Sequence, residues 1–581
     1  MNFDTQGFCI DLFSLTVVFS ALYYADRQIK KNVKYNNGLM CGVSFLTACL
    51  WLISRGFSVD NTTWSLYRSP IQIVKSIAYV LGMTHLLNGI GAVFHYLVVS
   101  KNKTVTHPLE KFQSYISCLI IMLIVWLPHT ITSHPASIEC DAWDSLYQYY
   151  GRAEFTAHHP PVFTILLGWF ADFGRLIGDI NVGFFMWTML QTLCCAAIMA
   201  YVLYTMNLLK TPRWLVILSF AIAAVSPFYT CYITTIVKDT MYSFAVLLYM
   251  VELVYMHISR EKYWKSPKHI CLLWISNIVM LLFRYNGKYI IYGVTIYLIV
   301  KCVFNREKLK ARVTKKYFVQ AFILMILPLL LSKGIVNVAV KHYQVTIQEG
   351  ESMRETLSIP FQQSARYAKC YSDETPDEEK EIIDKVIDYY ALANVYEPEI
   401  SDPVKSRFHY YATKEDWKEY FRVWFKQFLR HPFTYFGATL NQNYCLIYPQ
   451  RENSRFYYST YVDYFYDHDF MDEMGAAQEM TFSNANAARI ELYKLLHSMP
   501  ITGAFSNIAV YNIVIMYMIL FAICDKKRGA LWILIPIILS DLVVLAGPAI
   551  YDNIRYALPV VYSVPLALAY FIRIYNTGYE I

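Results

Sequence analysis

The chain has 581 residues, of which 56% are hydrophobic and 17% aromatic, and its formal net charge at pH 7 is +7. This hydrophobic share is well above that of a typical soluble domain, so the composition excludes an ordinary soluble protein and predicts an integral membrane protein. The positive charge is therefore interpreted through membrane topology, and not as a sign of nucleic-acid binding.

Apolar runs of about the length that crosses a bilayer predict an α-helical polytopic membrane protein with about thirteen transmembrane helices. The runs are 8–25, 39–53, 76–99, 114–133, 182–206, 213–228, 240–257, 270–283, 287–304, 317–337, 503–523, 530–547 and 556–574. No cleavable signal peptide is expected, because Asp4 precedes the first run and basic residues follow it.

Alternate loops between these runs are basic, which predicts that they lie in the cytoplasm if the chain starts outside. These loops are 27–34, 101–111, 210–213, 260–268, 306–316 and 526–528. The alternation holds only if 161–180 does not cross the membrane. This segment carries Asp172 and Arg175 among apolar residues at helical spacing, so we expect an amphipathic helix at the outer surface that starts at Pro161.

With this topology, the polar islands of the chain all fall on the outer face. They are 139–161, 238–239, 284–288, 547–556 and one large insertion, 338–502. We divide the chain into N-terminal transmembrane helices (1–112), a transmembrane core (113–337) with its first outer loop (134–181), an extracytoplasmic soluble domain (338–502) and C-terminal transmembrane helices (503–581).

The insertion is expected to be mostly helical. Apolar spacing predicts an exposed helix over 378–393 and an amphipathic helix over 417–429, and the acidic run 373–381 is interpreted as a solvated face. The 13 cysteines include no metal-like C-x-x-C pairing, and a disulfide among Cys140, Cys370 and Cys445 is left open.

The first outer loop concentrates acids and histidines at a membrane edge, where desolvating them is costly. Asp141 and Asp144 are three residues apart and share a face if the segment is helical. A carboxylate there could act as a general base or bind a divalent cation, or an aspartate could simply cap a helix. His158 and His159 could bind a phosphate or sugar hydroxyl, or could pack the turn before Pro160.

Four basic residues stand at the ends of apolar runs on the outer side, where the positive-inside rule disfavours them. They are Lys238, Arg284, Lys288 and Arg555. Together they favour an anionic ligand, because Arg presents a planar fork and Lys a compact charge to phosphate oxygens. The alternative for each one is snorkelling to lipid headgroups. The sequence holds no P-loop and no G-x-G-x-x-G before a helix.

At these residues the pattern resembles the C-type (GT-C) glycosyltransferases, and more narrowly a family of uncharacterised, mostly Gram-positive bacterial membrane proteins of that class. The matching pieces are W-D-S-L-Y-Q (143–148), A-H-H-P-P-V-F-T-I-L-L-G (157–168), V-K-D-T-M-Y (237–242), R-Y-N-G (284–287), I-P-F-Q-Q-S-A-R (359–366), H-P-F-T-Y (431–435) and R-Y-A-L-P (555–559). Each motif is weak alone, and their order supplies the specificity.

The resemblance implies Asp144 as the catalytic base, with Asp141 and Glu139 as alternative acids. It also implies a substrate site lined by His158, His159, Lys238, Asp239, Arg284, Asn286, Lys288, Arg555 and Tyr556, covered by Gln362, Gln363 and Arg366. No adjacent pair of acids of the D-D or D-E type follows the first core span, so a divalent cation is neither required nor excluded.

The implied function is transfer of a sugar from a polyprenyl-phosphate donor to an acceptor hydroxyl, at the extracytoplasmic side of the cell membrane, in cell-envelope glycan synthesis or modification. The partners would be the lipid-linked donor, a glycan or other hydroxyl acceptor and membrane lipids. The alternatives are a flippase or transporter of lipid-linked glycans, a glycan polymerase or ligase, and a structural or receptor protein. We see neither the related halves nor the mid-span acids that are typical of transporters.

Overall fold

The computed structural model describes residues 37–100, 114–259, 261–304, 311–347, 351–449, 468–476, 480–547 and 554–577. The predicted span 8–25 and the basic loops 27–34 and 101–111 lie outside these residues. The described chain is almost entirely helical, with a single two-stranded sheet among its elements.

The described chain begins with two helices that pack on each other, together with the short elements beside them. These are α2 (Asn37–Asp60), η1 (Trp64–Leu66), α3 (Pro70–His95) and the π-helix η2 (Tyr96–Ser100). The core then runs through α4 (Tyr115–Thr132), β1 (Ser137–Ile138), α5 (Cys140–Tyr149), α6 (Pro161–Leu176), α7 (Ile180–Leu208), α8 (Arg213–Val225), α9 (Pro227–Thr230), η5 (Tyr232–Thr234), β2 (Thr235–Ile236), α10 (Lys238–Ser259), α11 (Glu261–Trp264), α12 (Pro267–Phe283), α13 (Gly287–Phe304) and α14 (Ala311–His342).

The predicted insertion is helical, as expected. It contains α15 (Glu351–Thr356), α16 (Ser358–Tyr371), α17 (Asp377–Asp384), α18 (Tyr389–Val395), α19 (Asp402–Lys405), α20 (Lys414–Arg430), α21 (Pro432–Asn443), η6 (Tyr444–Leu446), α22 (His468–Met474), α23 (Ser483–Ser498) and α24 (Pro500–Ala504). The chain returns to the bundle with α25 (Ile508–Cys524), η7 (Arg528–Leu534), α26 (Ile535–Ala546), η8 (Ile554–Ala557) and α27 (Leu558–Thr577).

Each predicted span within the described residues coincides with a helix. Eight of the described helices are long and apolar enough to cross a membrane, or up to nine if the bent pair α8–α9 forms one span. Other predicted spans are shorter helices, such as α12 and α25 with 17 residues each. A multi-pass α-helical membrane protein is therefore supported, and the count of thirteen spans stays a prediction.

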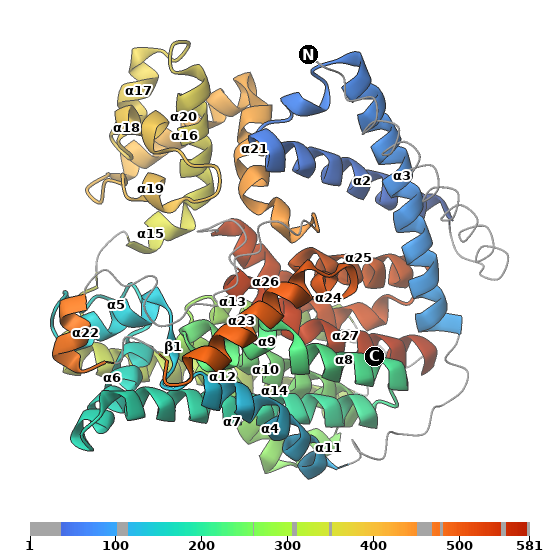
Figure 1. Cartoon of the computed structure of the whole chain (residues 1–581). Coiled ribbons are helices and arrows are strands. Elements are labelled where there is room, and N and C mark those ends of the chain that lie inside the picture. The colour runs from blue at the N-terminus through green and yellow to red at the C-terminus, as the bar shows by residue number, and fades with distance from the viewer. Residues whose placement is uncertain are drawn as a thin grey trace.

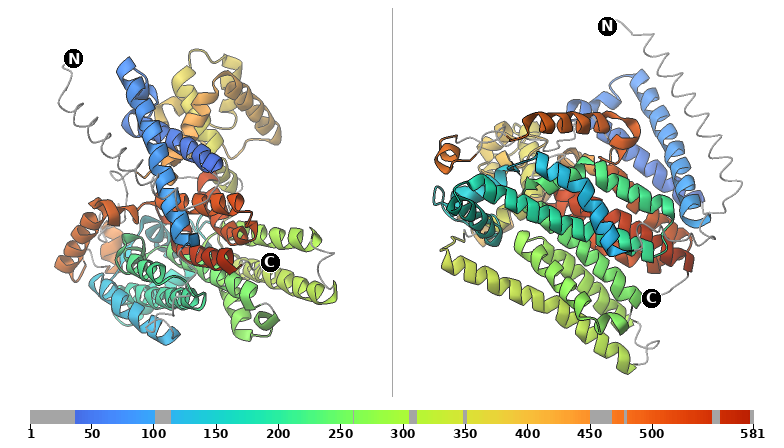
Figure 2. Two further views of the ribbon diagram at one scale, coloured as in Figure 1. Left: turned by 90° about the vertical axis from the view of Figure 1, so that its right-hand side faces the viewer. Right: turned by 60° about the horizontal axis from the view of Figure 1, so that its bottom comes forward.

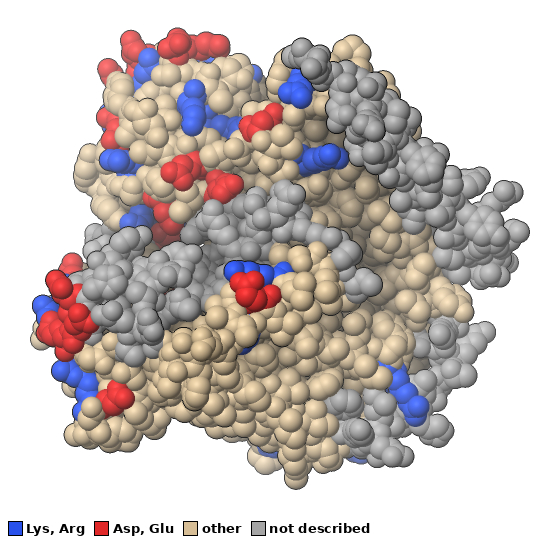
Figure 3. Space-filling model, in the orientation of Figure 1, with Lys and Arg blue, Asp and Glu red and all other residues tan. Residues whose placement is uncertain are grey.

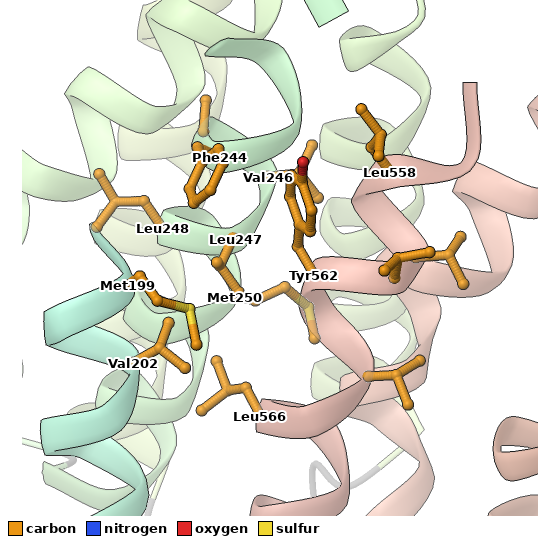
Figure 4. Packing of buried hydrophobic residues seen from close by; sticks show 14 of the residues in the cluster. Met199, Val202, Phe244, Val246, Leu247, Leu248, Met250, Leu558, Tyr562 and Leu566 are labelled. Atoms are coloured by element: carbon orange, nitrogen blue, oxygen red, sulfur yellow. The ribbon is translucent and has the colours of Figure 1, made fainter. Parts of the chain in front are cut away.

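Helices α7, α10 and α27 form the centre of the bundle. Side chains such as Met199, Leu247 and Leu566 interdigitate between them, as Figure 4 shows. Nearly every residue of α27 is buried, which is the expected environment of a helix that is apolar on all sides. Figure 3 shows that the surface over the bundle carries few charges, whereas charged residues gather over the upper left part of the molecule.

Helix α6 starts at Pro161, as predicted, and its 16 residues are too few for a candidate span. One face packs closely on α7, because a Cβ atom added at Gly183 would lie 2.1 Å from the carbonyl oxygen of Phe170. Trp169 and Phe173 are exposed on the other side. The helix therefore rests against the bundle, and its first residue follows the His158-His159 turn.

Helices α16 to α20 surround a separate hydrophobic cluster, which includes Phe361, Ile383, Leu392 and Val423. We call this unit the outer domain; it lies at the upper left of Figure 1 and at the upper right of the left view of Figure 2, apart from the bundle. Helix α21 packs mainly on α16 of the outer domain and also contacts α2, whereas α23 packs on α4.

Two sequence predictions in the outer domain need correction. The predicted helix 378–393 is two helices, because Asp388 caps α18 and the backbone around Val386 bonds to residues 407–409. The acidic run 373–381 is not solvated throughout, because Glu379 is buried and binds Arg430 at 2.6 Å. The predicted helix 417–429 is confirmed as part of α20.

Candidate active site at one end of the bundle

A short parallel sheet brings together two segments that are about a hundred residues apart in the chain. Strand β1 leads into α5 and strand β2 leads towards α10, with Ser137 opposite Thr235 and Ile138 opposite Ile236. The side-chain amide of Gln191 in α7 donates to three carbonyl oxygens around β2, at 2.9–3.1 Å. Two helices therefore start side by side at the same end of the bundle.

Acidic residues occupy these two helix starts. Glu139 is the N-cap of α5 and accepts a hydrogen bond from the Asp141 backbone N–H at 3.0 Å. Asp141 lies in the first turn of α5, and Asp239 in the first turn of α10. Carboxylates are stabilised there by the free N–H groups and the helix dipole. The residue that caps α5 is therefore Glu139, and not Asp141 or Asp144 as the capping alternative supposed.

Three cations from other elements bind these three carboxylates. Arg555 Nη1 lies 2.5 Å from Glu139 Oε1 and 3.1 Å from Asp141 Oδ2, and Arg555 Nε lies 3.8 Å from Asp239 Oδ2. Lys238 Nζ binds Asp141 Oδ2 at 2.6 Å, and Arg284 Nε binds Asp239 Oδ1 at 2.8 Å. We call these six residues the ion-pair cluster; its formal charges balance.

The ring of Tyr556 stands between the two guanidinium groups. The Arg284 and Arg555 Cζ atoms lie 4.8 Å and 4.9 Å from its centroid, and Arg555 donates to the Tyr556 hydroxyl at 2.9 Å. Such cation–π contacts hold guanidinium groups in place. The cluster therefore joins α5, α10, the α12–α13 turn and η8.

His159 extends the cluster with a neutral acceptor. Lys238 Nζ donates to His159 Nδ1 at 2.8 Å, and the imidazole is buried. Burial and the adjacent Lys238 charge hold the pKa of His159 well below its ordinary value. His158 is exposed, with its ring centroid 4.6 Å from that of His159. Tyr285, which is not among the predicted site residues, fixes this turn by donating to the Ala157 carbonyl oxygen at 2.8 Å.

The two aspartates of α5 differ in their electrostatics. Burial raises the pKa of Asp141, but the charges of Arg555 and Lys238 outweigh it and hold this pKa well below its ordinary value. The pKa of Asp144 is raised, first by burial and then by the negative charge of Asp141. Asp144 reaches solvent although the surrounding protein partly desolvates its side chain, and no described residue forms an ion pair or hydrogen bond with its carboxylate. Asp144 is thus the better proton acceptor of the two.

Lys288 and Asn286 lie at the turn between α12 and α13, beside Arg284. The Lys288 ammonium lies 5.1 Å from the Tyr289 ring centroid, and within the described residues no carboxylate forms an ion pair with it. The Asn286 carbonyl oxygen accepts the Tyr289 N–H at 3.1 Å. Lys288 therefore differs from the three cations of the cluster, whose charges are compensated.

The structure does not bring Gln362, Gln363 and Arg366 to this site. The Gln362 amide donates to the carbonyl oxygens of residues 397 and 400, and the Gln363 amide to Thr439 Oγ1 at 2.9 Å. Arg366 binds the Tyr396 hydroxyl and the Asn61 carbonyl oxygen. The expectation that these three residues cover the substrate is therefore wrong. Their polar groups instead hold the outer domain together and attach it to α2.

Glu139, Cys140 and Asp141 place one ligand atom each within 4.8 Å of one another. Both carboxylates already bind cationic side chains, so this group is a poor match for a divalent cation. Cys140, Cys370 and Cys445 are free thiols, and the disulfide left open among them is not formed.

The expectation that the spans lack acids near their middle is wrong. Glu252 is fully buried in α10, where it accepts from Tyr201 at 3.2 Å and lies 3.0 Å from His269 Nδ1. Asp541 lies in α26. Glu252 has partners on α7 and α12, so its place in an apolar helix is explained by a local polar cluster.

No curated protein and no solved structure matches this chain. A family model described as a family of unknown function, DUF6020, matches residues 150–578. The matched region includes the two histidines and the three cations of the site, whereas Glu139, Asp141 and Asp144 precede it. Because the match covers most of its length, the chain belongs to the DUF6020 family.

Proposed function

We propose that this protein is a membrane glycosyltransferase that moves a sugar from a polyprenyl-phosphate donor to an acceptor hydroxyl at the outer face of the membrane. The observation that carries the proposal is the unpaired Asp144 carboxylate, one helical turn from a charge-balanced cluster at the end of an apolar helical bundle. A proton acceptor beside fixed cations is what glycosyl transfer from a phosphate requires.

In the proposed reaction, the acceptor oxygen attacks the anomeric carbon of the donor sugar. The bond between that carbon and the phosphate oxygen breaks, and its electron pair stays on the lipid phosphate. The proton of the acceptor hydroxyl passes to Asp144. The raised pKa of Asp144 favours this role, since a base is most effective when its pKa approaches the working pH.

The leaving phosphate needs positive charge, and Lys288, four residues after Arg284, forms no ion pair with a described carboxylate. Lys238, Arg284 and Arg555 are each bound to carboxylates, so their expected contact with phosphate would require these ion pairs to rearrange. We therefore assign first contact with the phosphate to Lys288 and His158. The three paired cations would position Asp141 and the starts of α5 and α10.

The test is transfer of radiolabelled sugar from a panel of polyprenyl-phosphate sugars by the purified full chain in nanodiscs, with and without a chelator. Wild type is compared with Asp144→Asn, and with Glu154→Gln as the control, because Glu154 is an exposed carboxylate of the same loop. Asp144→Asn should lower transfer by about 10²–10⁴-fold while donor binding persists. Glu154→Gln should transfer at the wild-type rate.

Two results would redirect the proposal. Full transfer by Asp144→Asn would favour a polymerase or ligase in which Arg and His side chains suffice. Binding of lipid-linked sugar without any transfer by wild type would favour a transporter.

A further inference from the structure

Helix α20 carries apolar side chains on two opposite faces. Tyr420, Val423 and Gln427 are buried against the rest of the outer domain. Phe425 is two residues from both Val423 and Gln427, which places it about 200° around the helix from each. Phe421 and Leu429 lie one turn before and after Phe425 and share its face. This second face has no covering element among the described residues.

The exposed face continues into the next helix. After the turn at His431, α21 adds Phe433 and Phe436, and Phe428 links the two helices because its ring lies 6.1 Å from Phe425 and 5.8 Å from Phe436. We call the five exposed residues the phenylalanine ridge: Phe421 (38% exposed), Phe425 (52%), Leu429 (64%), Phe433 (87%) and Phe436 (61%). Contiguous apolar surface of this kind marks an interaction site.

The ridge is anchored beside a candidate membrane span. Near the other end of α21, Asn441 Nδ2 donates to Asn61 Oδ1 at 3.3 Å, and Tyr444 packs with Phe57 of α2. Figure 1 shows α21 running across this end of α2. The following turn exposes Trp64 and Tyr67, the ring types that gather at the edge of a bilayer. Since α21 is 12 residues long, its first residue lies within about 18 Å of these contacts with α2.

The chemistry of the ridge selects one kind of partner. Its side chains are pure hydrocarbon, without the hydroxyl or indole N–H groups that a sugar-binding surface would offer. Lys418, Arg422 and Lys426 are exposed on the same helix. Arg422 pairs with Glu419 and Lys426 with Glu379, whereas Lys418 has no described carboxylate partner and can reach a lipid phosphate. An apolar stripe bordered by basic residues is the pattern of a helix that lies in a membrane interface.

We propose that the phenylalanine ridge inserts into the outer-leaflet boundary between headgroups and acyl chains, and so holds the outer domain against the bilayer. This contact is independent of the glycosyltransferase proposal. It attaches the outer domain to the membrane beside α2, in addition to the Arg366 and Asn441 contacts.

The test is photocrosslinking in the full chain reconstituted in nanodiscs of phosphatidylcholine and phosphatidylglycerol. The photoreactive residue p-benzoylphenylalanine replaces Phe425 or Phe433, both exposed, so the core is left intact. The control sites are Tyr390 (64% exposed) and Tyr411 (76%), which belong to the same domain but not to the ridge. Adducts are identified by intact mass, and thermal unfolding checks that each variant is folded.

Both ridge variants should gain the mass of one phospholipid on illumination, and the control variants should not. Lipid adducts that are no more abundant at the ridge than at Tyr390 would overturn the proposal. A crosslink between two copies of the chain, in place of a lipid adduct, would also overturn it and assign the ridge to self-association.

Discussion

Replacing Arg555 with Met tests whether the ion-pair cluster holds the end of the bundle together. The variant removes the cation that binds Glu139 at 2.5 Å and Asp141 at 3.1 Å, and the Glu139 side chain is only 2% exposed. Removing one partner of a buried ion pair leaves an uncompensated charge, which typically costs about 3–5 kcal/mol. Lys238 still compensates Asp141, so most of this loss should arise at Glu139.

The assay is thermal unfolding of the purified full chain in one detergent, followed by intrinsic fluorescence. The matched control is Arg422→Met, because Arg422 is 64% exposed and binds Glu419 on the surface, where such a pair contributes about 0.2–1 kcal/mol. The double variant Glu139→Gln with Arg555→Met removes the stranded charge, and its amide oxygen can still accept the Asp141 N–H.

We expect the midpoint temperature to fall most for Arg555→Met, to recover in part in the double variant, and to change little for Arg422→Met. The recovery isolates the electrostatic part of the loss, because both variants lack the same Arg555 packing contacts. The reasoning is refuted if the double variant is no more stable than Arg555→Met, since the loss would then come from packing alone.

Three further predictions concern stability. Burial and the Asp141 charge raise the pKa of Asp144, so the ionised Asp144 carboxylate destabilises the fold at neutral pH. Asp144→Asn should therefore unfold at a higher temperature than wild type at pH 7. This gain should vanish as the pH falls below about 4, where the carboxyl group of wild type is protonated in the unfolded chain as well. Burial acts to raise the pKa of Glu379, but hydrogen bonds from Arg430 lower this pKa overall. Glu379→Gln should therefore lower the free energy of unfolding by about 1–3 kcal/mol at neutral pH, and by less as the pH falls below about 4. The exposed neighbour variant Glu378→Gln should match wild type in the same denaturation series. Gly183→Ala should lower the unfolding midpoint, because its Cβ would meet the backbone of α6. Gly334→Ala should not lower it, because no atom lies within 4 Å of the Cβ position there. Equal midpoints would contradict the close packing of α6 on α7.

Much of the fold follows from local patterns in the sequence. Each predicted span in the described residues is helical, because a run of apolar residues in a helix satisfies its own backbone and needs no particular partner. The start of α6 at Pro161 follows from the fixed φ of proline in a first helical turn. The prediction of one helix over 378–393 fails because the backbone there forms hydrogen bonds with residues 407–409, which interrupt the helix. Helical periodicity, a local pattern, does not encode these long-range bonds.

The sequence alone also determines which residue types gather at one end of the bundle. Alternating basic loops place Lys238, Arg284 and Arg555 on one side, and the structure brings these three together. Only the tertiary structure decides their partners, since the ion pair of Glu139 with Arg555 joins residues more than 400 positions apart. A charge's effect depends on which opposite charge lies within a few ångströms. Hence three residues that read as free cations in the sequence are paired in the fold, and Asp144 keeps an unpaired carboxylate among the described residues.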